Sequence, residues 1–304
     1  MLGAIIGDIA GSRFEFSPTN DYNFELFSNE CSFTDDTICT VAVADALLRN
    51  RDFGESIHDW CRRYPHPMGG YGGRFAAWVM SDNPQPYNSF GNGAAMRVSP
   101  VAWWSKDLSG VEILAKETSQ CTHNHPEGIK GAQAVAAAIY ECLFMRLDFL
   151  KKNKAPTKDD IINIGLKRAL ELSGYNIRLS LKNVQNHFDE TCQGTVPVAL
   201  WIISESSSFE DALRRAVSLG ADADTLGAIV GSIAEAIWDI PDEMKQQALS
   251  FLPQEMKDVV TEFYKVSILN QILTLDKMLE VRSQTADAVR SKKNPSKSVK
   301  YVGK

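Results

Sequence analysis

Two short acidic motifs, far apart in the chain, place the strongest constraint on how this sequence can fold. The first reads Thr34-Asp35-Asp36-Thr37 and the second Asp222-Ala223-Asp224-Thr225. Carboxylates brought close together repel one another or raise one another's pKa, so a fold that joins these motifs needs cations between them. Carboxylate and hydroxyl oxygens are the ligands that hard divalent ions prefer. If the motifs meet, the sequence predicts an all-oxygen site for ions such as Mg²⁺ or Mn²⁺.

Each acidic motif also directly precedes an apolar segment with helical spacing, residues 37–50 and 225–238. The carboxylates therefore lie at helix N-termini, where aspartate and threonine are common caps and compensate the helix dipole. Capping alone does not explain why both motifs carry two carboxylates. The matching chemistry of the two motifs favours metal binding over capping.

Apolar residues spaced three and four apart predict further helices, and alternation typical of strands is scarce. We expect an all-α fold with these helices: 126–146, 159–173, 209–219, one opening at Pro241, and one or two within 259–281. The chain has no fixed repeat and no long linker, so we predict one domain at residues 1–285. Residues 286–304 form a basic tail, which we expect to be a flexible, solvated end; a weak anion-docking tail is the alternative.

Composition narrows the class of protein. The 304 residues are 44% hydrophobic and 23% charged, enough apolar material for a sizeable core, and the net charge of −6 argues against a nucleic-acid partner. Six cysteines without a CxxC pair or zinc spacing indicate reduced thiols, and hence a cytoplasmic protein. No apolar run is long enough to span a membrane, and the N-terminus lacks the cationic region of a signal peptide. We expect a monomer.

Two glycine-rich loops are candidates for ligand binding. Gly91-Asn92-Gly93 precedes an expected helix, so its backbone N–H groups could cradle an anion such as phosphate, although Asn-Gly is also an ordinary turn. Upstream, the segment 69–74 is a second flexible loop that carries an aromatic residue. Together the loops favour a polyphosphate or nucleotide ligand.

Glu15 and the pair His123 and His125 each allow two interpretations. Glu15 is either a surface residue or a movable acid/base or metal-contacting carboxylate. The two histidines precede the helix expected from Pro126 and are two positions apart, so they do not share a helix face as a zinc pair would. They either cap that helix or contact a phosphate or another ligand group.

Taken in order, five segments between Gly7 and Thr225 resemble the ADP-ribosylglycohydrolase family. The segments are Gly7-Asp8-Ile9-Ala10-Gly11-Ser12-Arg13-Phe14-Glu15, the first acidic motif, Gly91-Asn92-Gly93-Ala94-Ala95-Met96-Arg97, Thr122-His123, and the second acidic motif with the residues before it. The resemblance covers residues 1–265. It implies a compact orthogonal multi-helix fold with a binuclear Mg²⁺ or Mn²⁺ centre in a cleft. One departure is Ala221, where the family has a second glycine.

The resemblance also implies roles for individual residues. The expected metal ligands are Thr34, Asp35, Asp36, Asp222, Asp224 and Thr225. The residues expected to bind ADP-ribose, largely through backbone donors, are Gly72, Gly91, Asn92, Gly93, Met96 and His123. Catalysis is expected from Glu15, Asp36 and Asp222, with Glu15 moving a proton or acting as a lid.

We therefore predict a Mg²⁺-dependent hydrolase that removes ADP-ribose from modified protein side chains by cleaving the glycosidic bond at C1″. The bacterial members of the family favour an N-linked arginine as the leaving group. One rival is a catalytically silent ADP-ribose-binding, immunity or structural protein on the same fold. Another is a different metal hydrolase such as a phosphoesterase, which would need further histidine or aspartate ligands; the chain has only five histidines and no Asp-x-His pair.

Overall fold

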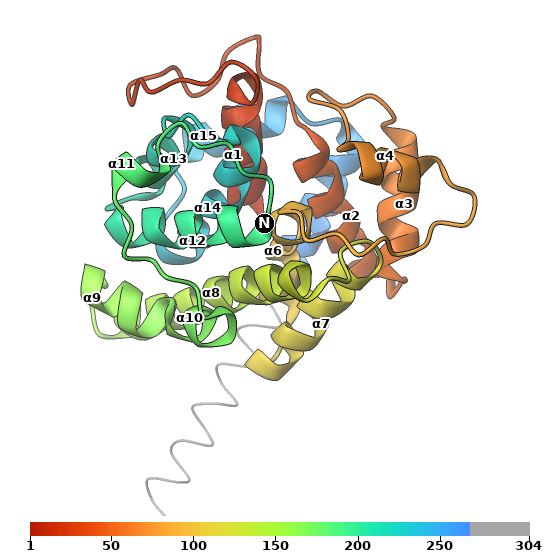
Figure 1. Cartoon of the computed structure of the whole chain (residues 1–304). Coiled ribbons are helices and arrows are strands. Elements are labelled where there is room, and N and C mark those ends of the chain that lie inside the picture. Colours follow the sequence, from red (N-terminus) through yellow and green to blue (C-terminus); the bar gives the residue numbers. More distant parts are fainter. Residues whose placement is uncertain (268–304) are drawn as a thin grey trace, which may run out of the picture.

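The structure, a computed structural model, describes residues 1–267 and is all-α over that range (Figure 1). The helices are α1 (Leu2–Gly11), α2 (Asp35–Arg49), α3 (Phe53–Arg63), α4 (Gly73–Met80), α5 (Gly93–Met96), α6 (Ser99–Trp104), α7 (Leu108–Gln120), α8 (Pro126–Lys151), α9 (Lys158–Asp160), α10 (Lys167–Ser173), α11 (Leu181–Val184), α12 (Cys192–Glu205), α13 (Phe209–Val217), α14 (Ala223–Ile237) and α15 (Asp242–Ser250). Residues 254–267 are also helical. A single isolated bridge joins Gly91 and Thr191 within the described range, which otherwise holds no strand.

The helices expected from apolar periodicity before residue 259 are present, with two differences. The helix from Pro126 continues to Lys151, beyond the expected end, because apolar residues recur through the extra turn. The segment expected as one helix from residue 159 is instead α9, a π-helical turn Ile161–Gly165, and α10. Of the range 259–281, only residues up to 267 are described, and they belong to a helix that begins at residue 254. The rest of that range, the predicted domain end at residue 285 and the basic tail lie outside the described residues.

Helices α1 and α14 pack antiparallel with their backbones in contact. A Cβ atom added to Gly7 would lie 1.9 Å from the carbonyl oxygen of Gly227, and one added to Gly3 would lie 2.1 Å from that of Gly231. Only glycine permits so close an approach, because any side chain would separate the helices. All residues of both helices are buried, so this pair forms the centre of the molecule and fixes the start of α14 beside the end of α1.

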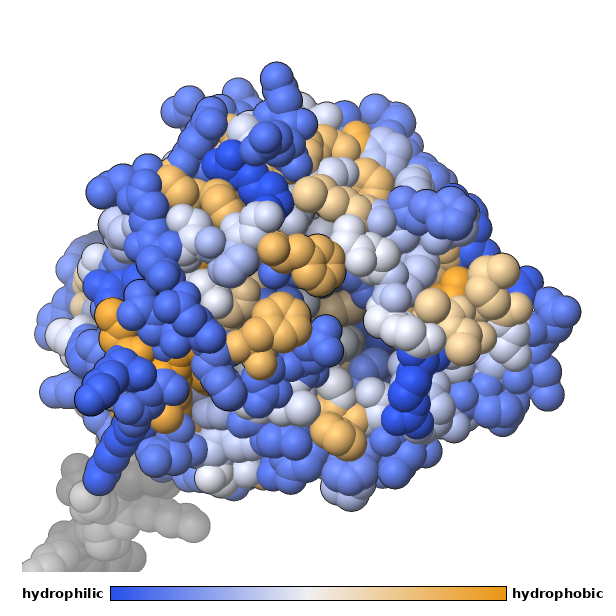
Figure 2. Space-filling view, turned by 45° about the horizontal axis from the view of Figure 1, so that its top comes forward, coloured by the Kyte–Doolittle hydropathy of each residue, from blue (hydrophilic) through white to orange (hydrophobic). Residues whose placement is uncertain are grey.

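In the view of Figure 1, helix α8 runs beneath this central pair and α2 lies to its right. Small residues on α8, most of them fully buried alanines, let α7, α10, α12 and α14 pack closely around it. On the face drawn in Figure 2, hydrophobic residues lie in small separate groups on a mainly hydrophilic surface. Among the helices described, none is long and apolar enough to cross a membrane.

Candidate metal and nucleotide site

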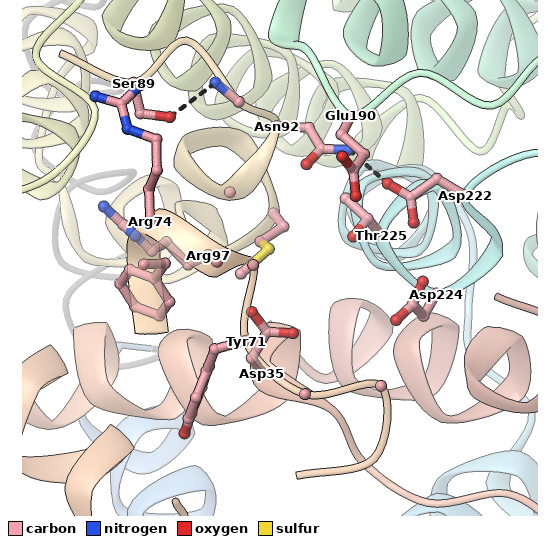
Figure 3. A pocket seen from close by; sticks show the side chains of 18 of the residues that line it. Asp35, Tyr71, Arg74, Ser89, Asn92, Arg97, Glu190, Asp222, Asp224 and Thr225 are labelled. Carbon is pink, nitrogen blue, oxygen red and sulfur yellow. Dashed lines mark hydrogen bonds between the residues drawn. The ribbon is translucent and has the colours of Figure 1, made fainter. Parts of the chain in front are cut away.

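A cleft of about 450 Å³ brings the predicted site residues together (Figure 3). Eleven of them line it: Glu15, Asp35, Gly72, Gly91, Asn92, Gly93, Met96, His123, Asp222, Asp224 and Thr225. The two others, Thr34 and Asp36, are buried behind the lining. In Figure 3 the carboxylates of Glu190, Asp222 and Asp224 lie on one side of the cleft, and the guanidinium groups of Arg74 and Arg97 on the other.

The two acidic motifs meet at the floor of the cleft. Asp8, Asp36 and Asp224 each offer a carboxylate oxygen, and these three atoms lie within 4.8 Å of one another. The Thr225 hydroxyl donates to Asp36 Oδ2 at 3.2 Å, which joins the first motif to the second directly. Asp36 Oδ1 and Asp224 Oδ1 are buried and have no hydrogen-bond partner. Unpaired buried oxygens on carboxylates that lie this close together fit the donor set of a hard divalent ion.

Asp8 belongs to this cluster, although the sequence reasoning did not include it. It sits in α1, fully buried, and its carboxylate accepts hydrogen bonds from the backbone and hydroxyl groups of Thr34 and Thr37. Asp8 therefore anchors the first turn of α2 to α1 and orients the first acidic motif. The signal was available in the sequence: an aspartate in the middle of an otherwise apolar helix is seldom buried without a partner.

The hydroxyl of Thr34 also caps α2, since it accepts a hydrogen bond from the backbone of Asp36. Capping is therefore part of what the first motif does. The second motif differs, because Asp222 occupies the N-cap position of α14 without a capping hydrogen bond from its side chain. Its Oδ2 instead accepts from the Asn92 side chain at 2.7 Å, and Asn92 also donates to the Thr195 hydroxyl. The Gly-Asn-Gly loop thus positions a carboxylate of the second motif.

Burial raises the pKa of every carboxylate in this cluster. It raises the pKa of Asp8 to about 6, against hydrogen bonds from Thr37 and Thr34 that lower it. It raises the pKa of Asp222 to about 6, against hydrogen bonds from Asp224 and Asn92. For Asp36 and Asp224, burial and then the neighbouring carboxylates hold the pKa well above its usual range. These shifts show the cost of placing several negative charges together without a cation.

Asp35 and Glu15 face the same cleft from its rim. Both are half-buried, and burial followed by the charge of Asp224 raises the pKa of each carboxyl, in Glu15 to about 8. Glu15 Oε2 has no hydrogen-bond partner and lies against Gly69, where an added Cβ would be 2.3 Å away. Gly69 has a φ of +76°, so the loop can pass this close to the carboxyl group. Glu15 is thus a cleft residue rather than a solvated surface glutamate.

The opposite wall carries the predicted ligand loops and histidine. His123 is 5% exposed and lines the cleft, whereas His125 lies outside the lining and caps α8 by accepting a hydrogen bond from the backbone of Glu127. The backbone N–H groups of the Gly-Asn-Gly loop are less available than expected. That of Gly91 donates to the Ser89 hydroxyl, and that of Asn92 to the Glu190 carbonyl.

The sequence reasoning also missed Arg97 and Glu190. Arg97 was quoted only as the end of a motif, yet it is fully buried and lines the cleft. Glu190 lies in the loop before α12, where no recognised motif marked it. Only the fold reveals its place, because that loop reaches the cleft from a distant part of the chain.

Comparison with known proteins agrees with this geometry. The family model described as ADP-ribosylglycohydrolase matches residues 1–273. An ADP-ribosylarginine hydrolase, Tri1, of Pseudomonas putida is 26% identical over 279 residues, covering 79% of this chain and 70% of that protein. Human ADP-ribosylhydrolase ARH3 is 24% identical over 315 residues, covering 81% and 87%. An uncharacterized protein of Archaeoglobus fulgidus is 31% identical over 273 residues, covering 78% and 85%.

A solved structure titled as an ADP-ribosylglycohydrolase-related protein complex has the same fold, with a TM-score of 0.65 at 23% identity. It aligns with 88% of this chain, and 97% of that chain is covered. The family match extends over the whole described range and includes every element that builds the cleft. The chain belongs to the ADP-ribosylglycohydrolase family of hydrolytic enzymes.

Proposed function

We propose that this protein is a Mg²⁺-dependent hydrolase that releases ADP-ribose from modified protein side chains by cleaving the glycosidic bond at C1″. The charge-divided cleft carries the proposal. One end holds the buried cluster of Asp8, Asp36 and Asp224, and the other holds Arg97 and His123. A ligand with a polyhydroxylated ring at one end and a diphosphate further along matches this division of charge.

Six residues of the two acidic motifs would hold two Mg²⁺ or Mn²⁺ ions, and Asp8 lies beside them: Thr34, Asp35, Asp36, Asp222, Asp224 and Thr225. Their unpaired buried oxygens and raised pKa values support this assignment. Bound ions would supply Lewis-acid polarisation of the ribose hydroxyls and of a water molecule.

The protein's own groups account for orientation and proton movement. In the metal-free protein burial raises the pKa of Glu15 to about 8, so this carboxyl group can hold a proton and donate it to the leaving group as the bond to C1″ breaks. The same carboxylate can then accept a proton from the attacking water. Asp36 and Asp222 hold the ribose in position, with Asp222 oriented by Asn92. The negative end of the cleft stabilises the oxocarbenium-like character of the transition state.

We further propose that an arginine side chain is the preferred attachment site. Glu190 supports this, because its carboxylate lies at the acidic end of the cleft, is exposed, and has no hydrogen bond or ion pair to any residue in the described range. A guanidinium group leaving from C1″ would offer that carboxylate a bidentate partner. The similarity to a protein named as an ADP-ribosylarginine hydrolase points the same way. The free thiols of all six cysteines support a cytoplasmic location, and we propose a monomer.

The proposal is tested with proteins carrying ADP-ribose on arginine or on serine, with and without Mg²⁺, by measuring released ADP-ribose. We expect Mg²⁺-dependent release, faster from arginine, and its loss in Asp36→Ala and Asp222→Ala. Glu190→Gln should reduce the preference for arginine while leaving the serine-linked rate unchanged. Near-normal turnover in both aspartate variants would exclude the proposed metal site. Binding of ADP-ribose without any release would instead identify a catalytically silent protein.

A further inference from the structure

His123 presents one ring nitrogen to the cleft without a partner. Its Nε2 atom has no hydrogen bond to any residue in the described part of the chain. A Cβ added to Gly93 would lie 3.1 Å from this atom, and one added to Gly91 would lie 3.4 Å away. The nitrogen therefore faces the Gly-Asn-Gly loop at the point where two of the backbone N–H groups are already used by Ser89 and Glu190. A side chain that donates a hydrogen bond at this point would supply part of the anion binding expected of the backbone N–H groups.

The other ring nitrogen determines whether Nε2 is a donor. His123 Nδ1 lies 2.7 Å from the Thr122 hydroxyl, and that hydroxyl accepts a hydrogen bond from the Arg97 guanidinium at 2.7 Å. A guanidinium can only donate, so the threonine proton is available for Nδ1. Nδ1 is then the acceptor, and the ring proton is on Nε2. The opposite tautomer would give the hydroxyl two donors and leave its own proton only the Cys121 sulfur, a weak acceptor.

Arg97 is held in place as a permanent charge. It is fully buried, donates also to the Thr118 carbonyl at 2.9 Å, and has no carboxylate within ion-pair distance among residues 1–267. Burial, followed by the charges of Arg97 and Arg74, holds the pKa of His123 well below its usual range. The ring of Tyr87 lies 6.0 Å from the imidazole, and the loop with Gly91 and Gly93 brings no charge. The histidine therefore stays neutral across the physiological range.

We propose that Arg97 and Thr122 are positioning residues that hold His123 as the neutral Nε2–H tautomer, so that Nε2–H donates to a phosphate oxygen of ADP-ribose. The contact with ADP-ribose rests on the proposed function, whereas the tautomer of His123 does not depend on it. The uncompensated charge of Arg97 adds attraction for the diphosphate without contacting it. The donor keeps the same charge as the pH changes, which a histidine in water would not do.

The tautomer is read in the ligand-free protein from ¹⁵N chemical shifts of labelled histidine. The chain has only five histidines, so comparison with His123→Asn assigns the signals. We expect the Nε2–H form in the wild type and a mixture in Thr122→Val, with Thr122→Ser restoring the wild-type pattern. An Nδ1–H or doubly protonated ring in the wild type near pH 7 would overturn the proposal, and this outcome needs no Thr122 variant to fold.

The role in binding is read by calorimetry with ADP-ribose between about pH 5 and about pH 8. We expect nearly constant affinity in the wild type. Thr122→Val should bind about tenfold more weakly, as loss of one charge-assisted donor implies, and should become pH-dependent. His66→Gln, an exposed histidine outside the cleft lining, is the matched control. Unchanged affinity and pH profile in Thr122→Val would refute the positioning role.

The two proposals fail in different ways. If the wild type neither binds nor releases ADP-ribose, the proposed function and the phosphate contact are both wrong, while the tautomer measurement still decides the arrangement of Arg97, Thr122 and His123. If ADP-ribose is bound and released normally but Thr122→Val behaves as wild type, only the positioning role is wrong.

Discussion

Removing metal ions should make the folded protein less stable as the pH rises. Asp8 and Asp222 each have a pKa raised from 3.8 to about 6 in the folded state. The unfolded chain releases these protons near 3.8, whereas the folded protein keeps them until about pH 6. The folded state therefore binds more protons within this window, and the free energy of unfolding falls as the pH rises through it.

The size of the loss follows from the shifts. A shift of about two pKa units corresponds to about 3 kcal/mol for each carboxylate, fully lost above about pH 7. Because the two carboxylates interact with the same neighbouring groups, their contributions do not simply add, and about 6 kcal/mol is an upper bound for their combined loss of stability. Asp35, Asp36 and Asp224 are shifted in the same direction and extend the decline to higher pH. A loss of this size is comparable to the whole stability of many domains.

The assay is urea denaturation in a chelator between about pH 5 and about pH 8, repeated with Mg²⁺. Because Mg²⁺ binds the ionised carboxylates, it should stabilise the protein more at the higher pH. Asp224→Asn removes one of the repelling charges, so it should flatten the pH dependence and lose the Mg²⁺ effect. Asp82→Asn, at a side chain that is 97% exposed, should change neither. Constant stability of the metal-free wild type, or equal Mg²⁺ stabilisation of Asp224→Asn, would refute the reasoning.

Three further outcomes are expected. Glu15→Gln should lower the rate of ADP-ribose release by about 100-fold or more, because the general acid is lost, while the affinity for ADP-ribose measured by calorimetry stays near that of the wild type. Unchanged turnover would exclude the acid role of Glu15. Gly7→Ala should lower the free energy of unfolding by at least about 3 kcal/mol, because its Cβ would meet the Gly227 carbonyl. The control Gly73→Ala has open space around its Cβ and should lower that free energy by less than about 1 kcal/mol. Similar midpoints of urea denaturation for the two variants would contradict the close packing of α1 and α14. ADP-ribose at about 100 times its dissociation constant should add about 2.7 kcal/mol of stability, and more with Mg²⁺; no shift in melting temperature would count against the ligand.

The sequence was most informative where chemistry and periodicity coincide. Each acidic motif opens an apolar helix, so the all-α class and the meeting of the motifs could both be inferred from patterns of a few residues. The break within residues 158–173 was not predicted, because a π-helical turn is a local change of backbone hydrogen bonding from i→i+4 to i→i+5, which the apolar pattern of so short a segment does not reveal. The observed helix ends also differ from the expected ones, because apolar spacing identifies the buried face of a helix, whereas capping contacts determine where it begins and ends.

The parts of the site that escaped prediction depend on contacts between distant segments. Asp8 becomes part of the acidic cluster only because α1 packs against α14 and contacts the start of α2. Glu190 reaches the cleft from a loop whose sequence carries no distinctive pattern. The use of the Asn92 amide by the Glu190 carbonyl likewise has no sequence signal. Such features follow from tertiary packing, which a single sequence does not report.

The pairing of α1 with α14 also has a consequence for how the protein is made. The apolar α1 spans Leu2–Gly11, and its glycine-matched partner α14 begins only at Ala223. A ribosome adding about 5–20 residues per second needs on the order of ten to forty seconds to supply the roughly two hundred residues between them. During that time α1 lacks its most extensive packing partner, and the acidic cluster does not yet exist. The backbone contact between the two helices and the complete acidic cluster can therefore form only after the chain has been made up to Thr225 and beyond.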